Sequence, residues 1–308
     1  MFDGKFHWWF GVVEERDDST ALDGYKLGRV RVRVMGLHSP FRNEDNDNGE
    51  GIPTNKLHWA YPMMPINSAS MNGIGESPTG IVEGTNVFGF SRDGDNYQEL
   101  IIMGTFGGVP QERPNYTVDG FSDPKQVYPK ADFLKEEDTN RLARNEKIDK
   151  TIVQTKKDTV TKSVYKALGG TWNQPPIPYA ATYPYNHVKE TESGHIVEFD
   201  DTKGNERIHQ YHRAGTFYEI DKEGTQVEKI VKDNYQIILG DDYIHVQGQC
   251  NVNIGGDATV YVHGNMKAEV NGNLNTKTHG DEYHEVKGNY SLQVAGNIDV
   301  DGSRIDLN

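Results

Sequence analysis

The middle of the chain holds carboxylates that could support acid and base chemistry. The candidate acids, with the hydroxyls near them, are Glu136, Glu137, Asp138, Asp149, Thr139 and Thr151. Glycoside hydrolysis needs two carboxyl groups held about 5–10 Å apart across a substrate cleft. The run from Ala131 to Leu168 has too few large apolar residues to build such a cleft. We therefore expect a solvated segment there and assign no catalytic and no cofactor-binding residues.

The last third of the chain carries an eight-residue repeat. Its glycines are Gly240, Gly248, Gly256, Gly264, Gly272, Gly280, Gly288 and Gly296. Each is followed by Asp, Asn or Gln, and Gly before Asn or Asp is a turn signal because both tolerate left-handed backbone angles. Each repeat thus predicts a turn followed by a short strand.

One face of each predicted strand is apolar. Apolar residues alternate with polar ones, which is the period of a β-strand. At the seventh position of the repeat, which we call the axial core, the residues are Val246, Ile254, Val262, Val270, Val286 and Val294. Such narrow faces cannot close a core within one chain, so the repeat needs stacking neighbours. We expect three chains to wind into a triple-stranded β-helix with these residues at the axis.

Two other interpretations of the repeat compete with this needle. A calcium-binding solenoid has a nine-residue Gly-rich pattern, whereas the period here is eight. A single-chain β-helix of a carbohydrate enzyme or adhesin needs many more residues in each coil. Both fit the repeat less well than an intertwined trimer.

A few side chains of the repeat could meet at the axis of such a trimer. His284 falls at the fifth position, so three copies could hold an axial metal ion or anion, although a purely structural role is favoured. Cys250 falls at an inward position and is expected to pack as a small hydrophobe. His263 and His279 fall outside and are expected to be solvated. No other cofactor is expected.

The N-terminal third predicts a small barrel. The clearest strand is Leu27 to Val34, where valines alternate with Arg29, Arg31 and Arg33. We expect the valines to be buried and the arginines to face solvent or an acidic partner. The other expected strands are Phe10 to Val13, Leu57 to Tyr61, Thr85 to Phe90 and Leu100 to Thr105. Five short strands fit a barrel of the OB type.

The chain is therefore expected to be all-β with three regions. They are an OB-fold domain over 1–111, an extended linker with a short exposed helix over 112–184, and a trimeric needle over 185–308 with its repeats at 240–303. In the first strand of the needle region, Ile196 and one of Val197 or Phe199 are expected to pack inward.

Composition excludes several classes of protein. Lys and Arg number 32 against 46 Asp and Glu, a net charge of −14, which argues against nucleic acid as a partner. The N-terminus has no signal-peptide core and no run of about 18 apolar residues occurs, so neither standard secretion nor a membrane span is expected. The single cysteine is compatible with synthesis in a reducing cytoplasm.

The sequence resembles the central spike, or cell-puncturing, proteins of T-even-type contractile-tail phages, and more distantly the VgrG spikes of type VI secretion. Besides the repeats, the resemblance is carried by 9–14, 27–38, 51–54, 71–75, 103–108, 120–124, 190–201 and 301–306. It implies a homotrimer in the virion tail baseplate, made in the host cytoplasm, with the OB domain seated on a hub ring protein. It also implies that the needle pierces the host outer membrane and that a PAAR-type tip protein is a candidate partner at its C-terminus.

The resemblance fails in the middle of the chain. That family has a central lysozyme domain, but the residues between Pro124 and Pro184 are too few for one. We therefore expect a structural spike that is not an enzyme. The alternatives are a wall hydrolase with a reduced site in this segment and a VgrG-type spike.

Overall fold

The structure is a computed structural model, and it describes residues 7–42, 51–107, 138–145 and 152–306. The chain divides into two compact units, Met1–Asn253 and Ile254–Asn308. No helix in these described ranges is long and apolar enough to cross a membrane.

The N-terminal part is a closed five-stranded barrel. Its strands are β1 (His7–Glu15), β2 (Val30–Val34), β3 (Trp59–Pro62), β4 (Asn86–Ser91) and β5 (Leu100–Phe106), in the order β1-β2-β3-β5-β4. Three short 3-10 helices lie between them, η1 (Asp18–Thr20), η2 (Thr54–Lys56) and η3 (Gly94–Asn96). Alternate residues of the strands, from Trp9 to Ile102, fill one apolar core. The predictions of an all-β chain and of a small barrel in this region are confirmed.

The arginines in and next to β2 differ from the prediction. The sequence predicted that they face solvent or an acidic partner, yet Arg29 and Arg33 are only 5% and 9% exposed. Arg33 Nε lies 2.7 Å from Glu14 Oε1 on the neighbouring strand. Arg29 pairs in the same way with carboxylates of the segment after β1. Acidic residues of the same domain thus pair with these cations and neutralise their charge.

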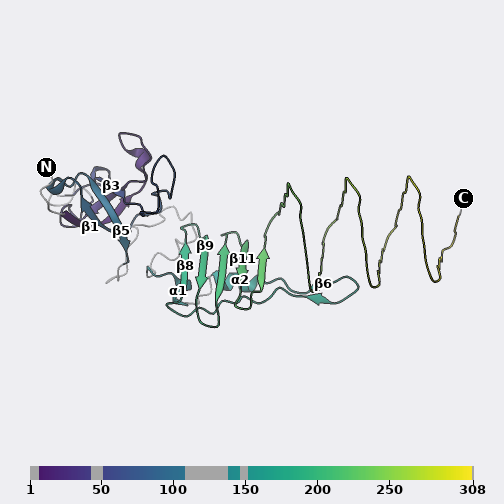
Figure 1. Cartoon of the computed structure of the whole chain (residues 1–308). Helices are drawn as coiled ribbons and strands as arrows, with labels where there is room; N and C mark the ends of the chain where they lie inside the picture. Colours follow the sequence, from purple (N-terminus) through teal and green to yellow (C-terminus); the bar gives the residue numbers. More distant parts are fainter. Residues whose placement is uncertain (1–6, 43–50, 108–137, 146–151, 307–308) are drawn as a thin grey trace. The chain divides into compact units, whose positions relative to one another are not determined.

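A second sheet follows in the sequence. Its strands are β8 (Asn186–Glu190), β9 (Ile196–Asp200), β10 (Arg207–Tyr211), β11 (Phe217–Ile220) and β12 (Gln226–Lys229). They form an antiparallel meander in which each strand pairs with the next (Figure 1). The four turns each contain a glycine at positive φ, the left-handed conformation that glycine adopts without strain.

One face of this sheet is covered by the segment that precedes it. That segment contains α1 (Arg141–Arg144), α2 (Ile152–Asp158), β6 (Val164–Tyr165) and β7 (Thr171–Trp172). Leu142, Tyr179 and Ala181 of the segment share one buried cluster with residues of the sheet. The sequence predicted an exposed helix in a solvated linker here. The described parts of this segment instead pack against the sheet. A few apolar residues spaced along the polar segment all contact the same face of it.

The repeat region follows β12. No strand is formed over residues 231–306, which are exposed throughout. The chain runs back and forth and bends at every repeat glycine, from 239–240 to 295–296 (Figure 1). The eight-residue period of the sequence is thus also a period of the backbone.

Candidate functional site

The axial core residues are uncovered in the single chain. Val262 is 46% exposed and Ile254 is 58% exposed, and the other members fall between 44% and 53%. Valine and isoleucine are among the residue types most often buried in folded proteins. Residues two apart in the repeat contact each other, as when Tyr261 Oη lies 3.3 Å from His263 Nδ1. Such contacts between residues two apart are typical of an extended chain, in which successive side chains point to opposite faces.

The polar candidates of the repeat are dispersed in the single chain. His284 Nε2 lies 2.9 Å from Glu282 Oε1, on the same face as the axial core. Cys250 is an exposed free thiol. Within the described ranges, no group of three or more His, Cys, Asp or Glu side chains gathers in a way that could hold a metal ion. The axial ion at His284 stays a prediction that needs more than one chain.

The titratable side chains that do gather lie inside the second sheet, where the sequence had not indicated them. We call this set the ionic cluster, and its members are Lys156, Glu198, Arg207, His209 and Glu219. Each is at most 4% exposed. Lys156 comes from α2, and the others come from β9, β10 and β11. Two carboxylates thus face two permanent or near-permanent cations and one imidazole.

Each member of the ionic cluster has close partners. Glu198 accepts from Arg207 at 2.6 Å and contacts His209 Nδ1 at 2.5 Å. The other ring nitrogen of His209, Nε2, lies 2.8 Å from Lys156 Nζ. Lys156 also donates to Glu219 Oε1 at 2.7 Å. With Nδ1–H donated to Glu198, the neutral ring accepts a hydrogen bond from the lysine ammonium at Nε2.

Burial and pairing shift the pKa values of the cluster. Burial alone would raise the pKa of Glu198, but the hydrogen bond from His209 and the charge of Arg207 lower it to about 2. Burial lowers the pKa of Lys156 to about 8, against the opposing pull of Glu219. Burial likewise lowers the pKa of His209, which stays neutral at pH 7. The cluster is therefore a charge-balanced set at neutral pH.

The ionic cluster has the residue types of a catalytic site, but a substrate cannot reach it. A general acid or base must come within hydrogen-bond reach of a substrate. The side chains of Glu198 and His209 are 1% exposed, so no substrate can reach them without opening the sheet cover. The cluster instead joins α2 to the sheet by contacts that leave its buried charges compensated.

The sequence-based acid candidates lie only partly within the described residues. Asp138 and Thr139 are exposed. Glu136, Glu137, Asp149 and Thr151 lie outside the described residues.

The outer wall of the barrel carries a group of aromatic rings that the sequence reasoning missed. We call it the aromatic patch, and its members are Trp8, Phe10, Phe88, Phe90 and Phe106. Phe10 lies 6.4 Å from Phe88 and 6.0 Å from Phe106 between ring centroids. Trp8 and Phe10 are 53% and 54% exposed. The signal was present as aromatics two residues apart in both β1 and β4, which places them on one face of each strand.

Comparison with known proteins gives a family match that overlaps the barrel in part. Residues 36–187 match the family described as the Gp5 N-terminal OB domain. The chain is also 43% identical over 274 residues to Protein Gp5 of Vibrio phage KVP40, a match that covers 80% of this chain and 63% of that protein.

A second relative is the pre-baseplate central spike protein Gp5 of Enterobacteria phage T4. The two are 48% identical over 130 residues, which is 42% of this chain and 21% of the T4 protein. The chain is thus similar to two Gp5 proteins. It spans less than two thirds of the length of either relative.

Proposed function

We propose that this protein is a homotrimeric central spike of a contractile-tail baseplate, which pierces the host outer membrane when the tail contracts. The observation that carries the proposal is the repeat region, where every turn of the chain leaves an apolar stripe uncovered. Three copies wound about one axis would bury these stripes and satisfy the strand edges between successive layers. The name of the T4 relative, a pre-baseplate central spike protein, supports the same role.

The proposed mechanism is mechanical. A closed triple-stranded β-helix is stiff, and its narrow end concentrates force on a small area of membrane. No bond chemistry is required. The direct test is the mass of the purified full chain in solution by light scattering, which should equal three chains. A monomer at micromolar concentration would refute the intertwined needle.

The barrel is proposed to seat the spike on a hub ring protein of the baseplate. The aromatic patch is suited to this contact, because clustered exposed apolar side chains mark interaction sites and aromatic residues are enriched in them. Replacing Trp8 and Phe90 with Ser should abolish incorporation of the chain into baseplates assembled from the same virion's proteins. The matched control is Tyr25→Ser, which removes a 65% exposed aromatic of a loop and should leave incorporation unchanged.

We also propose that the chain is not an enzyme, that its place is the virion tail baseplate after synthesis in the host cytoplasm, and that a tip protein caps its C-terminus. The closed ionic cluster supports the first point, since its carboxylates cannot meet a substrate. A peptidoglycan-clearing assay on the purified trimer tests it. Clearing activity would favour the wall hydrolase instead.

A further inference from the structure

The outer wall of the barrel has an open pocket beside β3, which we call the β3 pocket. Its volume is about 400 Å³, within the range of about 300–1,000 Å³ that is typical of small-molecule sites. The pocket is separate from the aromatic patch, with which it shares no residue. Its lining includes Arg29 from the loop before β2, Trp59 and Tyr61 from β3, and Arg92, Gln98 and Glu99 from the loop between β4 and β5.

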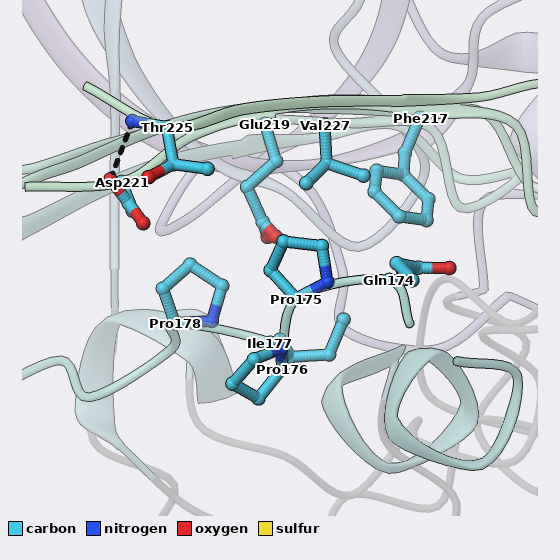
Figure 2. Close-up of a pocket in the computed structure, with 10 residues that line it drawn as sticks. All are labelled: Gln174, Pro175, Pro176, Ile177, Pro178, Phe217, Glu219, Asp221, Thr225 and Val227. Carbon is cyan, nitrogen blue, oxygen red and sulfur yellow. Dashed lines mark hydrogen bonds between the residues drawn. The ribbon is translucent and has the colours of Figure 1, made fainter. Parts of the chain in front are cut away.

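A second depression, between the second sheet and residues 174–178, is much smaller. Figure 2 shows Phe217, Glu219 and Val227 pointing toward this segment, which lies across the sheet. The volume left between them is about 10 Å³, which is room for about one water molecule. This depression is therefore filled by the chain itself, whereas the β3 pocket can admit a ligand.

Trp59 and Tyr61 form the aromatic side of the β3 pocket. Both point outward, because Ala60 between them is 0% exposed in the barrel core and strand residues alternate. Arg31 Cζ lies 4.3 Å from the centre of the Trp59 ring. Arg29 Cζ lies 5.7 Å from the centre of the Tyr61 ring, which is held in place by this contact while Tyr61 remains 41% exposed. The strand thus offers a fixed aromatic surface to a ligand.

The polar side chains of the pocket are nearly neutral in sum. Arg29 donates two hydrogen bonds to the carboxylate of Asp23, at 2.8 and 2.9 Å. Arg92 Nε lies 2.9 Å from Glu99 Oε2, and both of these side chains are more than half exposed. Gln98, which is also exposed, adds an amide that both donates and accepts hydrogen bonds. Donors and acceptors therefore lie side by side, and both guanidiniums already have carboxylate partners.

A sugar ring has surfaces that match both sides of this pocket. Its C–H groups form an apolar face that can pack on an aromatic ring, and each hydroxyl at its rim both donates and accepts hydrogen bonds. Nucleic acid fits less well, because its binding draws on clustered cations and the chain has a net charge of −14. A peptide that binds by adding a strand needs a free sheet edge, and the barrel is closed.

We propose that the β3 pocket binds a neutral sugar chain of the host cell envelope. The rings of Trp59 and Tyr61 stack on the sugar, and the side chains of Arg92, Gln98 and Glu99 bond its hydroxyls. The inference goes beyond the proposed piercing role, because it gives the barrel a ligand of its own. The sugar chain can come from the glycan strands of peptidoglycan or from an uncharged surface polysaccharide, which share this chemistry.

Calorimetric titration of the full chain with defined oligomers tests the proposal. Chitotetraose, which is built from N-acetylglucosamine, represents the wall glycan. Cellotetraose and maltotetraose, which are uncharged glucose chains, represent surface polysaccharides. Decaproline is the competing probe, because grooves lined by aromatic side chains also bind proline-rich segments.

At least one of the three sugar chains should bind with a dissociation constant of about 1 mM or tighter. Tyr61→Ala should weaken this binding about tenfold or more, because it removes a stacking ring. Arg92→Ala should also weaken it, and this change at an exposed loop residue leaves the barrel core intact. The matched controls are Tyr165→Ala in β6 and Arg213→Ala in the turn after β10, which remove exposed side chains of the same types and should leave binding unchanged.

Binding of chitotetraose alone would support the pocket and identify the wall glycan as the source of the sugar. Binding of a glucose chain would support it with a surface polysaccharide as a source. The proposal is overturned if none of the three sugar chains binds, if decaproline binds more tightly than every sugar, or if Arg92→Ala and a folded Tyr61→Ala bind like the unmodified chain. The proposed spike is tested separately, by the mass of the chain in solution.

Discussion

Lys156 Nζ on α2 lies 2.7 Å from Glu219 Oε1 on β11, and both side chains are 3% exposed. The two residues are far apart in the sequence, and the contact joins the segment that precedes the sheet to the sheet itself. Lys156 Nζ also lies 4.0 Å from the centre of the Phe217 ring. One lysine thus joins a helix to the buried charged residues of the sheet.

Replacing Lys156 with Met should destabilise the fold. The change leaves Glu219 buried with one cation fewer, and breaking a buried ion pair from one side costs about 3 kcal/mol. Thermal and urea unfolding, compared at one chain concentration, measure the loss. Lys157→Met is the matched control, because Lys157 is an exposed neighbour on the same helix and should change stability by less than about 0.5 kcal/mol. Equal effects of the two changes would contradict the role of the cluster.

Acid should unfold the sheet through Glu198. Its pKa is about 2 in the folded chain against an ordinary value of 4.5. A carboxyl with a lowered folded pKa contributes stability that is fully present above the unfolded pKa and is lost as pH falls toward the folded one. The contribution is about 3 kcal/mol. His209, whose pKa burial lowers from 6.5, adds a loss of the same sign as pH falls below its unfolded value.

The measurement is the urea midpoint of the chain at a series of pH values from neutral to acid. Glu198→Gln should be less stable at neutral pH and should show a flatter dependence on pH. The control is Glu223→Gln, an exposed carboxylate in the turn before β12, which should keep the slope of the unmodified chain. If the urea midpoint of Glu198→Gln still falls steeply with pH, other groups cause the acid sensitivity.

A charge placed on the axial core should prevent assembly. Val262→Asp would bring three carboxylates together at the proposed axis, where they would be desolvated and mutually repelled. We expect the mass in solution to fall from three chains to one. Tyr261→Asp is the matched control, because it changes the adjacent residue on the other face, where Tyr261 is 83% exposed. If both variants remain trimers, the assignment of the inward face is wrong.

Gly89 of β4 should tolerate no side chain. A Cβ at this position would lie 1.8 Å from the carbonyl oxygen of Ile101 and 2.9 Å from the Trp9 ring. Because backbone and core must both move, Gly89→Ala is expected to cost about 3 kcal/mol or to prevent barrel formation. Circular dichroism and melting temperature report the change. Thr105→Ala, at an exposed position of the adjacent strand β5, should be close to neutral.

The sequence by itself was sufficient to predict features that rest on local periodicity. Alternation of Val30, Val32 and Val34 predicted a barrel strand, and all three are at most 3% exposed in its core. The glycine period predicted bends, and the backbone bends at each repeat glycine. Local signals suffice in these cases because turn chemistry and strand period depend only on neighbouring residues.

Local periodicity could not predict which face of a strand is buried. In β9, Ile196 was correctly expected inside, but its companion inside is Glu198, while Phe199 is open. Arg33 of β2 and Arg29 just before this strand are buried beside valines. A charge can be buried only where opposite charges and donors converge on it. Those partners come from distant segments, as Lys156 does for Glu219. Strands and turns were therefore determined by the sequence alone, whereas tertiary structure decided which charges the fold encloses and which apolar faces it leaves exposed.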